Sequence, residues 1–181
     1  MPLYLVRHGR PAATFAEAED AGLAPAGLAQ AEAVASRLAP SGPLAIVTSP
    51  LRRTRETAAP LERLWARRAQ VNTAVAEIPS PGLSLVERGE WLRRLMAGGW
   101  SDVGADLARW RQNVVASLLA VGEPAVVFTH YIAINVAVGH AVGDDRVVVF
   151  APDHCSVTVL DASGGELRLL ERGVEAETRV L

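Results

Sequence analysis

The sequence predicts an α/β fold, a three-layer α/β/α sandwich built on a mostly parallel sheet. Short apolar runs typical of buried strands, such as residues 3–6 and 125–128, alternate with longer segments in which apolar residues recur at helical spacing. Histidine, arginine and glutamate residues directly follow several of the short runs, where open α/β sheets bind their ligands. Together these observations predict a ligand site at one edge of the sheet.

The composition restricts the class of protein. The chain of 181 residues is long enough for one well-buried core, so we expect a single domain over residues 1–181. Half of the residues are hydrophobic, and the net charge of -2 gives no long-range attraction to nucleic acid or anionic membranes. The chain has one cysteine, Cys155, and neither a membrane-spanning apolar stretch nor a signal-peptide pattern. We therefore expect a cytoplasmic protein with no membrane partner.

The first half of the chain is expected to alternate three strands with two helices. Apolar residues recur at helical spacing from Pro25 to Leu38, and turn-forming residues follow. Pro60 lies inside the second helical pattern and predicts a kink or break there. The expected elements are, in order, a strand over residues 3–6, a helix over 25–38, a strand over 45–47, a helix over about 51–65 and a strand over 71–76.

The second half is expected to contain three helices and a β-rich end. Gly98 and Gly99 separate two helical patterns, and Gly143 closes a third. Residues 163–165 predict a hairpin turn, and the charged tail from Gly173 is expected to fray. The expected elements are helices over about 85–97 and 105–119, a strand over 125–128, a helix over 132–143, and strands over 146–150, 155–160 and 167–170.

Chemically active side chains follow four of the expected strands. The carboxyl ends of parallel strands meet at one edge of a sheet, so we expect these side chains to lie close together. They are Arg7 and His8 after the first strand, Ser49, Arg52 and Arg53 after the second, Glu77 after the third, and His130 after the strand over 125–128. Ser49 is also expected to cap the helix that follows it.

Several of these residues suit the binding of a phosphoryl group without a metal. The planar guanidinium groups of Arg7 and Arg53 can bind phosphate oxygens bidentately. His130 can add a third donor, and the backbone N–H of Tyr131 can add a fourth if Tyr131 opens a helix. We therefore interpret these four residues as the groups that stabilise the charge of a phosphoryl transition state.

His8 and Glu77 supply the remaining groups of a phosphoryl transfer. His8 can attack phosphorus through one ring nitrogen while a carbonyl holds the other nitrogen and fixes the tautomer. Glu77 can protonate the leaving oxygen and then deprotonate the attacking water, with Glu87 and Glu90 as nearby alternatives for this role. His154 is interpreted as a structural or surface residue, with a place in the pocket wall as the alternative.

The arginine-rich stretch over residues 52–68 has two other interpretations. Most of its arginines fit a solvated basic face of a helix, and Arg53 stands out only by its position. A nucleic-acid patch is the second alternative, but the stretch lacks interleaved aromatic residues and the chain is net negative. We therefore expect no nucleic-acid partner. The four histidines lack the short spacing of metal-ligand motifs, so no metal site is expected.

The chain resembles a known family in four blocks, each just after an expected strand or at a helix start. Residues 5–9, L-V-R-H-G, are similar to the signature on the first strand of the histidine phosphatase superfamily, which includes the cofactor-dependent phosphoglycerate mutases. The other similar blocks are residues 23–31, which match its L-T-x-x-G-x-x-Q-A helix start, residues 48–58, which match its S-x-L-x-R-A-x-x-T-A block, and residues 128–130, which match the block with the second histidine. The resemblance covers nearly the whole chain.

The resemblance implies a phosphoglycerate mutase-like fold and a phosphohistidine intermediate on His8. It implies no metal, and we expect no cofactor. It also implies a phosphate pocket formed by Arg7, Arg53 and His130, with an acid after the third strand. These implications agree with the roles assigned above from the chemistry of the residues.

Two departures from the family pattern concern the substrate. Arg10 stands where many members have an acidic or other polar residue, and we interpret it as a substrate contact of this protein. The segment over residues 78–122 is short and lacks the long insertion of the glycolytic mutases. We expect this helical segment to determine specificity, and its length favours a phosphatase over a mutase.

We therefore expect a histidine-type acid phosphatase, a hydrolase that acts on a phosphorylated small molecule or a phosphoprotein. The alternatives are a phosphoglycerate mutase and a catalytically weak module that binds phosphate or phosphoprotein on the same fold. A homodimer is also possible, because Phe150, Val157 and Val159 fit either the core or an edge-strand interface.

Overall fold

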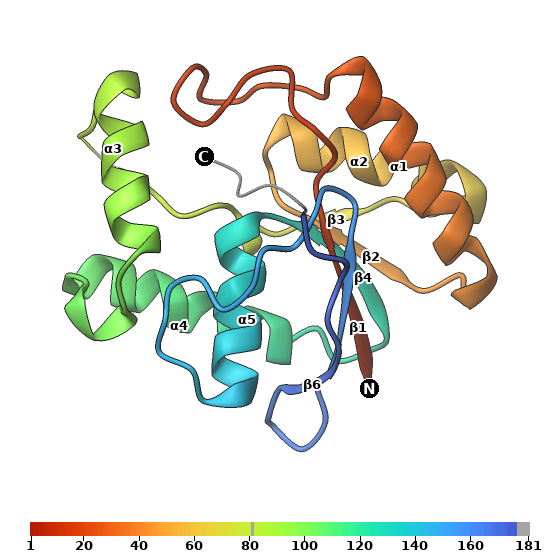
Figure 1. Cartoon of the computed structure of the whole chain (residues 1–181). Coiled ribbons are helices and arrows are strands. Elements are labelled where there is room, and N and C mark those ends of the chain that lie inside the picture. The colour runs from red at the N-terminus through yellow and green to blue at the C-terminus, as the bar shows by residue number, and fades with distance from the viewer. Residues whose placement is uncertain (81, 177–181) are drawn as a thin grey trace.

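A central sheet separates two layers of helices in the computed structural model, which describes residues 1–80 and 82–176 (Figure 1). Within these residues the sheet has six strands in the order β3-β2-β4-β1-β5-β6. Strands β3, β2, β4 and β1 are parallel, whereas β5 is antiparallel to β1 and β6 to β5. The strands are β1 (Pro2–Arg7), β2 (Ala45–Thr48), β3 (Gln70–Val71), β4 (Ala125–Thr129), β5 (Val157–Asp161) and β6 (Arg168–Glu171). The predicted three-layer sandwich with a mostly parallel sheet is confirmed.

The helices form one layer on each face of the sheet, and one helix stands apart at the side (Figure 1). Helices α1 (Pro25–Leu38) and α2 (Arg52–Trp65) pack against each other on one face. Helices α4 (Ala105–Leu119) and α5 (Tyr131–Val142) pack on the opposite face. Helix α3 (Leu85–Met96) stands apart and has no fully buried residue.

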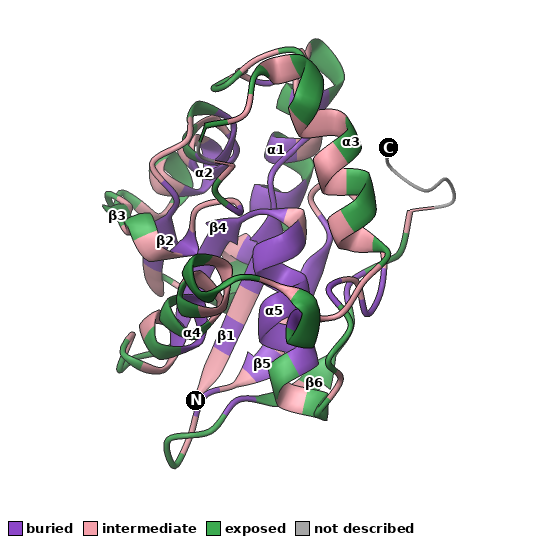
Figure 2. Ribbon diagram, turned by 90° about the vertical axis from the view of Figure 1, so that its left-hand side faces the viewer, coloured by how far each residue is buried: buried purple, intermediate pink, exposed green. Residues whose placement is uncertain are grey.

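Strand β4 shows how the sheet and both helical layers share the core. All of its residues are buried, because helices cover both faces of a central parallel strand. Val126 and Phe128 pack in the cluster with α1 and α2, whereas Ala125 and Val127 pack with α4 and α5. Figure 2 shows the same burial along most of α5. No helix within residues 1–80 and 82–176 is long and apolar enough to cross a membrane.

The third strand is much shorter than predicted. Strand β3 covers only Gln70–Val71 instead of residues 71–76, and a 3-10 turn over Thr73–Val75 follows it. The side chain of Asn72 accepts a hydrogen bond of 3.0 Å from a backbone N–H of this turn, which favours the turn over extended backbone. Glu77 therefore follows a turn rather than a strand.

The strand predicted over residues 146–150 does not form. Val149 and Phe150 donate their backbone N–H groups to the side-chain oxygen of Asn135, at 2.7 and 3.1 Å. Asn135 is fully buried on α5. One buried amide thus takes the place of a partner strand, because buried backbone groups need a hydrogen-bond partner of some kind.

The residues considered for a dimer contact lie inside the chain's own fold. Phe150 and Val157 are buried, and Val159 is partly buried against the core. Strand β5, which holds the two valines, lies between β1 and β6 and is not an edge strand. The core interpretation of these residues is therefore the one that fits the structure.

Helix α2 runs through Pro60 without a break, contrary to the prediction. Pro60 is buried, and its neighbours Ala58 and Leu61 are fully buried in the core between α1, α2 and the sheet. Tertiary packing of this face supplies more stability than the lost backbone hydrogen bond removes.

Residues 173–176, which were predicted to fray, are instead held by hydrogen bonds to the rest of the fold. The backbone N–H of Gly173 donates to the Thr158 hydroxyl at 3.2 Å. The backbone N–H of Asp153 donates to Val174 O at 2.8 Å, and the backbone N–H of Ala176 donates to Ala151 O at 2.9 Å. The predicted frayed tail beyond residue 176 lies outside the described residues.

Candidate active site

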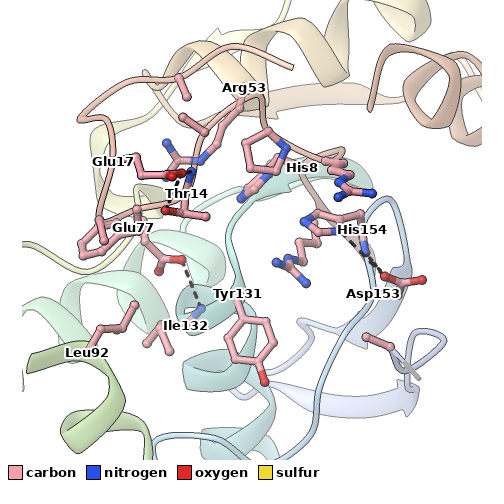
Figure 3. A pocket seen from close by; sticks show the side chains of 18 of the residues that line it. His8, Thr14, Glu17, Arg53, Glu77, Leu92, Tyr131, Ile132, Asp153 and His154 are labelled. Atoms are coloured by element: carbon pink, nitrogen blue, oxygen red, sulfur yellow. Dashed lines mark hydrogen bonds and ion pairs between the residues drawn. The ribbon is translucent and has the colours of Figure 1, made fainter. Parts of the chain in front are cut away.

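The carboxyl ends of β1, β2 and β4 meet at one edge of the sheet, beside a cavity of about 1030 Å³ (Figure 3). The loop over residues 10–24 and helix α3 form its outer walls. The sequence-predicted residues that line this cavity are Arg7, His8, Arg10, Arg53, Glu77 and Tyr131. The structure therefore brings together side chains from three strand ends and two further segments, as expected for a parallel sheet.

His8 is held in one orientation by backbone groups. Its backbone N–H donates to Thr129 O at 3.0 Å, and its ring nitrogen Nδ1 lies 2.8 Å from Gly9 O. A carbonyl oxygen only accepts, so Nδ1 carries the proton and Nε2 carries the lone pair. Burial, assisted by the guanidinium groups of Arg53 and Arg7, holds the pKa of His8 well below its usual value. The ring is therefore neutral near pH 7 and has a nucleophilic nitrogen.

Glycines let the loop after His8 lie directly on α1. A Cβ at Gly9 would stand 2.6 Å from Gly27 O, closer than any real side chain allows. The backbone N–H of Gly9 donates to the Thr57 hydroxyl at 3.0 Å, which ties the same loop to α2. The carboxyl end of β1 is thus anchored to both helices of one layer.

Arg7 and Arg53 are the two buried cations of the site. Arg7 Nη1 donates to Pro152 O at 2.8 Å, and its guanidinium carbon lies 5.0 Å from the centre of the Tyr131 ring. Burial lowers the pKa of both arginines, against the raising effect of Glu77. The neighbour of Arg53, Arg52, instead points to solvent and pairs with a glutamate on its own helix.

The His130 ring centre lies 5.2 Å from that of His8, and His130 is fully buried and does not line the cavity. Its Nε2 is 2.8 Å from Ser49 Oγ, whereas its Nδ1 has no hydrogen-bond partner within residues 1–80 and 82–176. Ser49 Oγ also accepts from Leu51 N at 3.2 Å. Ser49 was predicted as a helix cap, but Leu51 occupies the cap position.

Glu77 is positioned at the site by the 3-10 turn over Thr73–Val75, which follows the short strand β3. Thr129 donates its hydroxyl to Val75 O at 2.6 Å, which fastens this turn to the end of β4. The Glu77 carboxylate accepts from Ile78 N at 3.0 Å and from Ile132 N, in the first turn of α5, at 3.5 Å. Burial raises the pKa of Glu77 although hydrogen bonds and the two buried arginines oppose this.

The two alternative carboxylates are engaged elsewhere. Glu87 forms a capping box with Ser84 at the start of α3, with a backbone hydrogen bond of 2.8 Å. Glu90 lies 3.6 Å from Arg94 on the exposed side of the same helix. Neither lines the cavity, so among the three candidate carboxylates only Glu77 does.

The structure adds His154 and Asp153 to the cavity wall. The His154 ring lies 5.8 Å from that of His8, and burial together with Arg7 lowers the pKa of His154 to about 4. Figure 3 shows the two histidines side by side, with Asp153 next to His154. Pocket lining was only the alternative for His154, and Asp153 carried no sequence signal at all.

The turn that holds His154 depends on Cys155. Its φ of 56° is left-handed, and its N–H donates to Arg7 O at 3.0 Å. The strand was predicted to begin at residue 155. Because of this turn, β5 begins at Val157 instead. The thiol is partly buried, and burial raises the pKa of Cys155 to about 12. It is therefore protonated and unreactive near pH 7.

Tyr131 is the first residue of α5, one residue before the predicted start, and His130 is the N-cap. Its ring lines the cavity and packs on Arg7. The use of its backbone N–H by a ligand stays a prediction. Within residues 1–80 and 82–176, no group of three His, Cys, Asp or Glu side chains is arranged to hold a metal ion.

The chain matches known proteins over nearly its full length. The model of the histidine phosphatase superfamily (branch 1) matches residues 3–174. A search of the curated proteins finds no match. The chain is similar in structure to a phosphoserine phosphatase from Entamoeba histolytica solved with 3-phosphoglyceric acid, with a TM-score of 0.74, 19% identity and 96% of each chain covered.

Two further solved structures share this fold. A mycobacterial glucosyl-3-phosphoglycerate phosphatase has a TM-score of 0.74 and 20% identity, covering 97% of this chain and 99% of that one. A protein from Thermus thermophilus has a TM-score of 0.65 and 22% identity, covering 96% and 99%. At such identities the structural likeness shows the fold. The family model, which matches most of the chain, shows that this protein belongs to the histidine phosphatase superfamily (branch 1).

Proposed function

We propose that the protein is a metal-independent phosphomonoester hydrolase that works through a phosphohistidine on His8. The observation that carries this proposal is the hydrogen bond between His8 Nδ1 and Gly9 O, which leaves Nε2 as the nucleophile. Arg7 and Arg53 line the same cavity as His8 and supply positive charge for the phosphoryl group. Membership of the histidine phosphatase superfamily supports the same chemistry.

In the first step the phosphoryl group binds between Arg7 and Arg53, which stabilise its negative charge. The Nε2 lone pair of His8 attacks phosphorus while the bond from phosphorus to the alcohol oxygen breaks. Glu77 gives its proton to that departing oxygen, and its raised pKa supports the protonated form that this step needs. The step leaves a phosphohistidine, an ionised Glu77 and a free alcohol.

In the second step water replaces the histidine. The Glu77 carboxylate takes a proton from water as the water oxygen attacks phosphorus, and the bond from phosphorus to Nε2 breaks. Inorganic phosphate leaves, and His8 and Glu77 regain their initial forms. His130 Nδ1 has no hydrogen-bond partner within residues 1–80 and 82–176, and in the tautomer that places the proton there it adds a donor to the phosphoryl oxygens in both steps. The backbone N–H of Tyr131 adds another.

The substrate is a phosphorylated small molecule or a phosphoprotein. Support comes from the similar structures, whose names specify phosphoserine and glucosyl-3-phosphoglycerate as substrates of those proteins. The segment over residues 78–122 selects the leaving group, because α3 contributes Leu92, Arg93 and Met96 to the cavity wall. The single, unreactive cysteine supports a reducing compartment such as the cytoplasm.

Trapping of the phosphoenzyme tests the nucleophile. After brief incubation with a labelled phosphomonoester and an alkaline quench, wild-type protein should carry the phosphoryl group on His8, located by mass spectrometry. His8→Ala should carry no label, while the matched control His140→Ala, an exposed histidine on α5, should be labelled like wild type. Label on the His8→Ala protein would show that another residue is the nucleophile.

The same preparation separates hydrolase from mutase. With 2,3-bisphosphoglycerate and 3-phosphoglycerate together, a hydrolase releases one inorganic phosphate for each ester bond that it breaks. A mutase instead converts 3-phosphoglycerate to the 2-isomer with no net release of phosphate. A protein that binds phosphate but gives neither product would be the binding module.

A further inference from the structure

His154 lines the cavity beside the nucleophile, yet the two steps described above give it no role. Its ring centre lies 5.8 Å from that of His8, almost as near as the ring of His130 at 5.2 Å. Unlike His130, it is open to the cavity. Because attack and hydrogen-bond distances are each about 3 Å, a phosphoryl group placed against His8 would lie within reach of His154.

The turn that carries His154 is fastened to the end of β1. The backbone N–H of Cys155 donates to Arg7 O at 3.0 Å, and the backbone N–H of Arg7 donates to Ser156 O at 3.3 Å. His8 directly follows Arg7, so these backbone bonds also fix the position of His154 relative to the nucleophile. The ring therefore stands beside the reacting atom on a rigid base, as a preorganised group requires.

The His154 ring keeps its hydrogen-bonding capacity for a ligand. Its nitrogens have no hydrogen-bond partner within residues 1–80 and 82–176. Nδ1 lies 3.8 Å from Asp153 Oδ1, beyond hydrogen-bond distance, and that oxygen accepts the backbone N–H of His154 at 2.7 Å. Burial, together with Arg7, lowers the pKa of His154 to about 4. The ring is therefore neutral near pH 7 and has one N–H donor.

His154 and Glu77 lie on either side of His8 in Figure 3. The proposed reaction assigns Glu77 to the alcohol oxygen, which departs on the side of phosphorus opposite His8. The phosphoryl group has three further oxygens, and these carry its negative charge in the transition state. His154 is thus placed to meet one of these oxygens, whereas the departing oxygen belongs to Glu77.

We infer that His154 is a further catalytic residue, which donates a hydrogen bond from its ring to a phosphoryl oxygen on the side of His8 away from Glu77. The inference rests on the proposed function, since it adds a contact to the same reaction. The proton stays on the His154 ring throughout, and the hydrogen bond stabilises the charge of the transition state. Because every substrate shares the phosphoryl group, the contact serves all of them alike.

Replacement of His154 tests this donor at pH 7. His154→Leu should lower kcat/KM about 10- to 100-fold, by the same factor for an alkyl phosphate and for nitrophenyl phosphate. The inhibition constant of vanadate, which mimics the five-coordinate transition state, should rise by a similar factor. His154→Asn and His154→Gln each retain an amide N–H, so at least one of them should recover part of both losses. His140→Leu, at an exposed histidine of α5, is the matched control and should match wild type.

Two results would overturn the inference. A loss confined to one of the two substrates, with vanadate inhibition unchanged, would show that His154 contacts the alcohol portion. Losses that neither amide variant reduces would show a purely structural role. Urea unfolding at pH 7 checks that each variant is folded, and His154→Ala replaces His154→Leu if the leucine variant is not.

Phosphate binding separates this inference from the proposed function. If wild type hydrolyses no phosphomonoester, the proposed function fails. Calorimetric titration of the His8→Ala protein with inorganic phosphate needs no turnover. Addition of His154→Leu to this protein should weaken phosphate binding about tenfold. Equal phosphate binding with and without His154→Leu would refute the contact even in an active enzyme.

Discussion

Burial is the main influence on the pKa of the Glu77 carboxyl group. At its ordinary pKa a glutamate is almost fully ionised near pH 7 and is a poor general acid. Burial raises the pKa of Glu77, while Arg53 and Arg7 limit the rise. The protonated form needed for the first step is therefore lost as the pH rises through this raised pKa, and kcat/KM should fall on that alkaline side.

Replacement of Glu77 by Gln tests this role through the leaving group. An alkyl alcohol needs a proton to leave, whereas nitrophenolate does not. Glu77→Gln should lower kcat/KM by about 100-fold for alkyl phosphates and much less for nitrophenyl phosphate. kcat/KM reports the first step only, so water attack does not obscure the comparison. Equal losses would assign the acid to another residue, with Glu87→Gln and Glu90→Gln as controls.

At the residue scale, the sequence pattern distinguished the site arginine from its neighbouring arginines, which composition alone could not do. The block around residues 48–58 singled out Arg53 from Arg52, and the structure buries Arg53 while Arg52 points to solvent. His154 could not be placed in the same way. It reaches the cavity because Cys155 takes a left-handed φ, and no residue preference predicts that conformation for a cysteine.

Helix α3 contacts the core through partly buried apolar side chains, among them Trp91, Leu92 and Leu95. It has no fully buried residue, so its position depends on partly exposed side chains. Arg88 Nη2 lies 3.1 Å from Glu19, and its guanidinium carbon lies 5.5 Å from the Phe15 ring centre. Both partners belong to the loop over residues 10–24. Arg88 therefore connects the two outer walls of the cavity.

Loss of Arg88 should loosen this wall. We expect Arg88→Ala to raise KM severalfold for substrates whose leaving group fills the cavity, because the walls no longer hold one position. The free energy of unfolding should change by only about 1 kcal/mol. Steady-state kinetics and urea unfolding measure the two effects. Arg94→Ala removes a similar arginine that pairs only within α3 and should leave KM unchanged.

At the element scale, the order and type of the helices and strands were predictable from the sequence. Which groups the backbone of each segment would hydrogen-bond to was not. Apolar runs and helical spacing predicted the alternation of strands and helices in the order found. The two wrong strands, over residues 71–76 and 146–150, were lost to the side chains of Asn72 and Asn135. Asn135 binds backbone groups 14 and 15 residues along the chain, so this contact depends on tertiary structure and leaves no local pattern. Asn72 instead accepts from Ala74 N, only two residues on, which is a local turn signal that the apolar pattern over residues 71–76 outweighed.

At the scale of the whole molecule, the buried histidines link stability to pH. Burial lowers the pKa of His8, His130 and His154 in the folded protein. A group with a lowered pKa binds a proton more readily in the unfolded chain. Its contribution to stability is complete above the unfolded pKa of about 6.5 and is lost as the pH falls toward the folded value. The fold should therefore be acid-sensitive below that pH.

His154→Asn should reduce this sensitivity. With a folded pKa of about 4, His154 takes up a proton on unfolding between pH 6.5 and 4. Between pH 7 and 5 the variant should lose about 1–2 kcal/mol less stability than wild type. Urea unfolding at the two pH values measures the difference, with His140→Asn as the exposed control. A variant as acid-sensitive as wild type would contradict the assignment.

Because the Cys155 thiol is unreactive near pH 7, labels should attach only to cysteines that are introduced into the protein. Because the only cysteine of the chain has a pKa of about 12, maleimide at pH 7 should leave it unmodified. Two introduced cysteines, one on the exposed side of α3 and one in the loop over residues 10–24, would then take fluorophores or spin labels selectively. The distance between the two outer walls could be followed in solution during catalysis without altering the turn that carries His154.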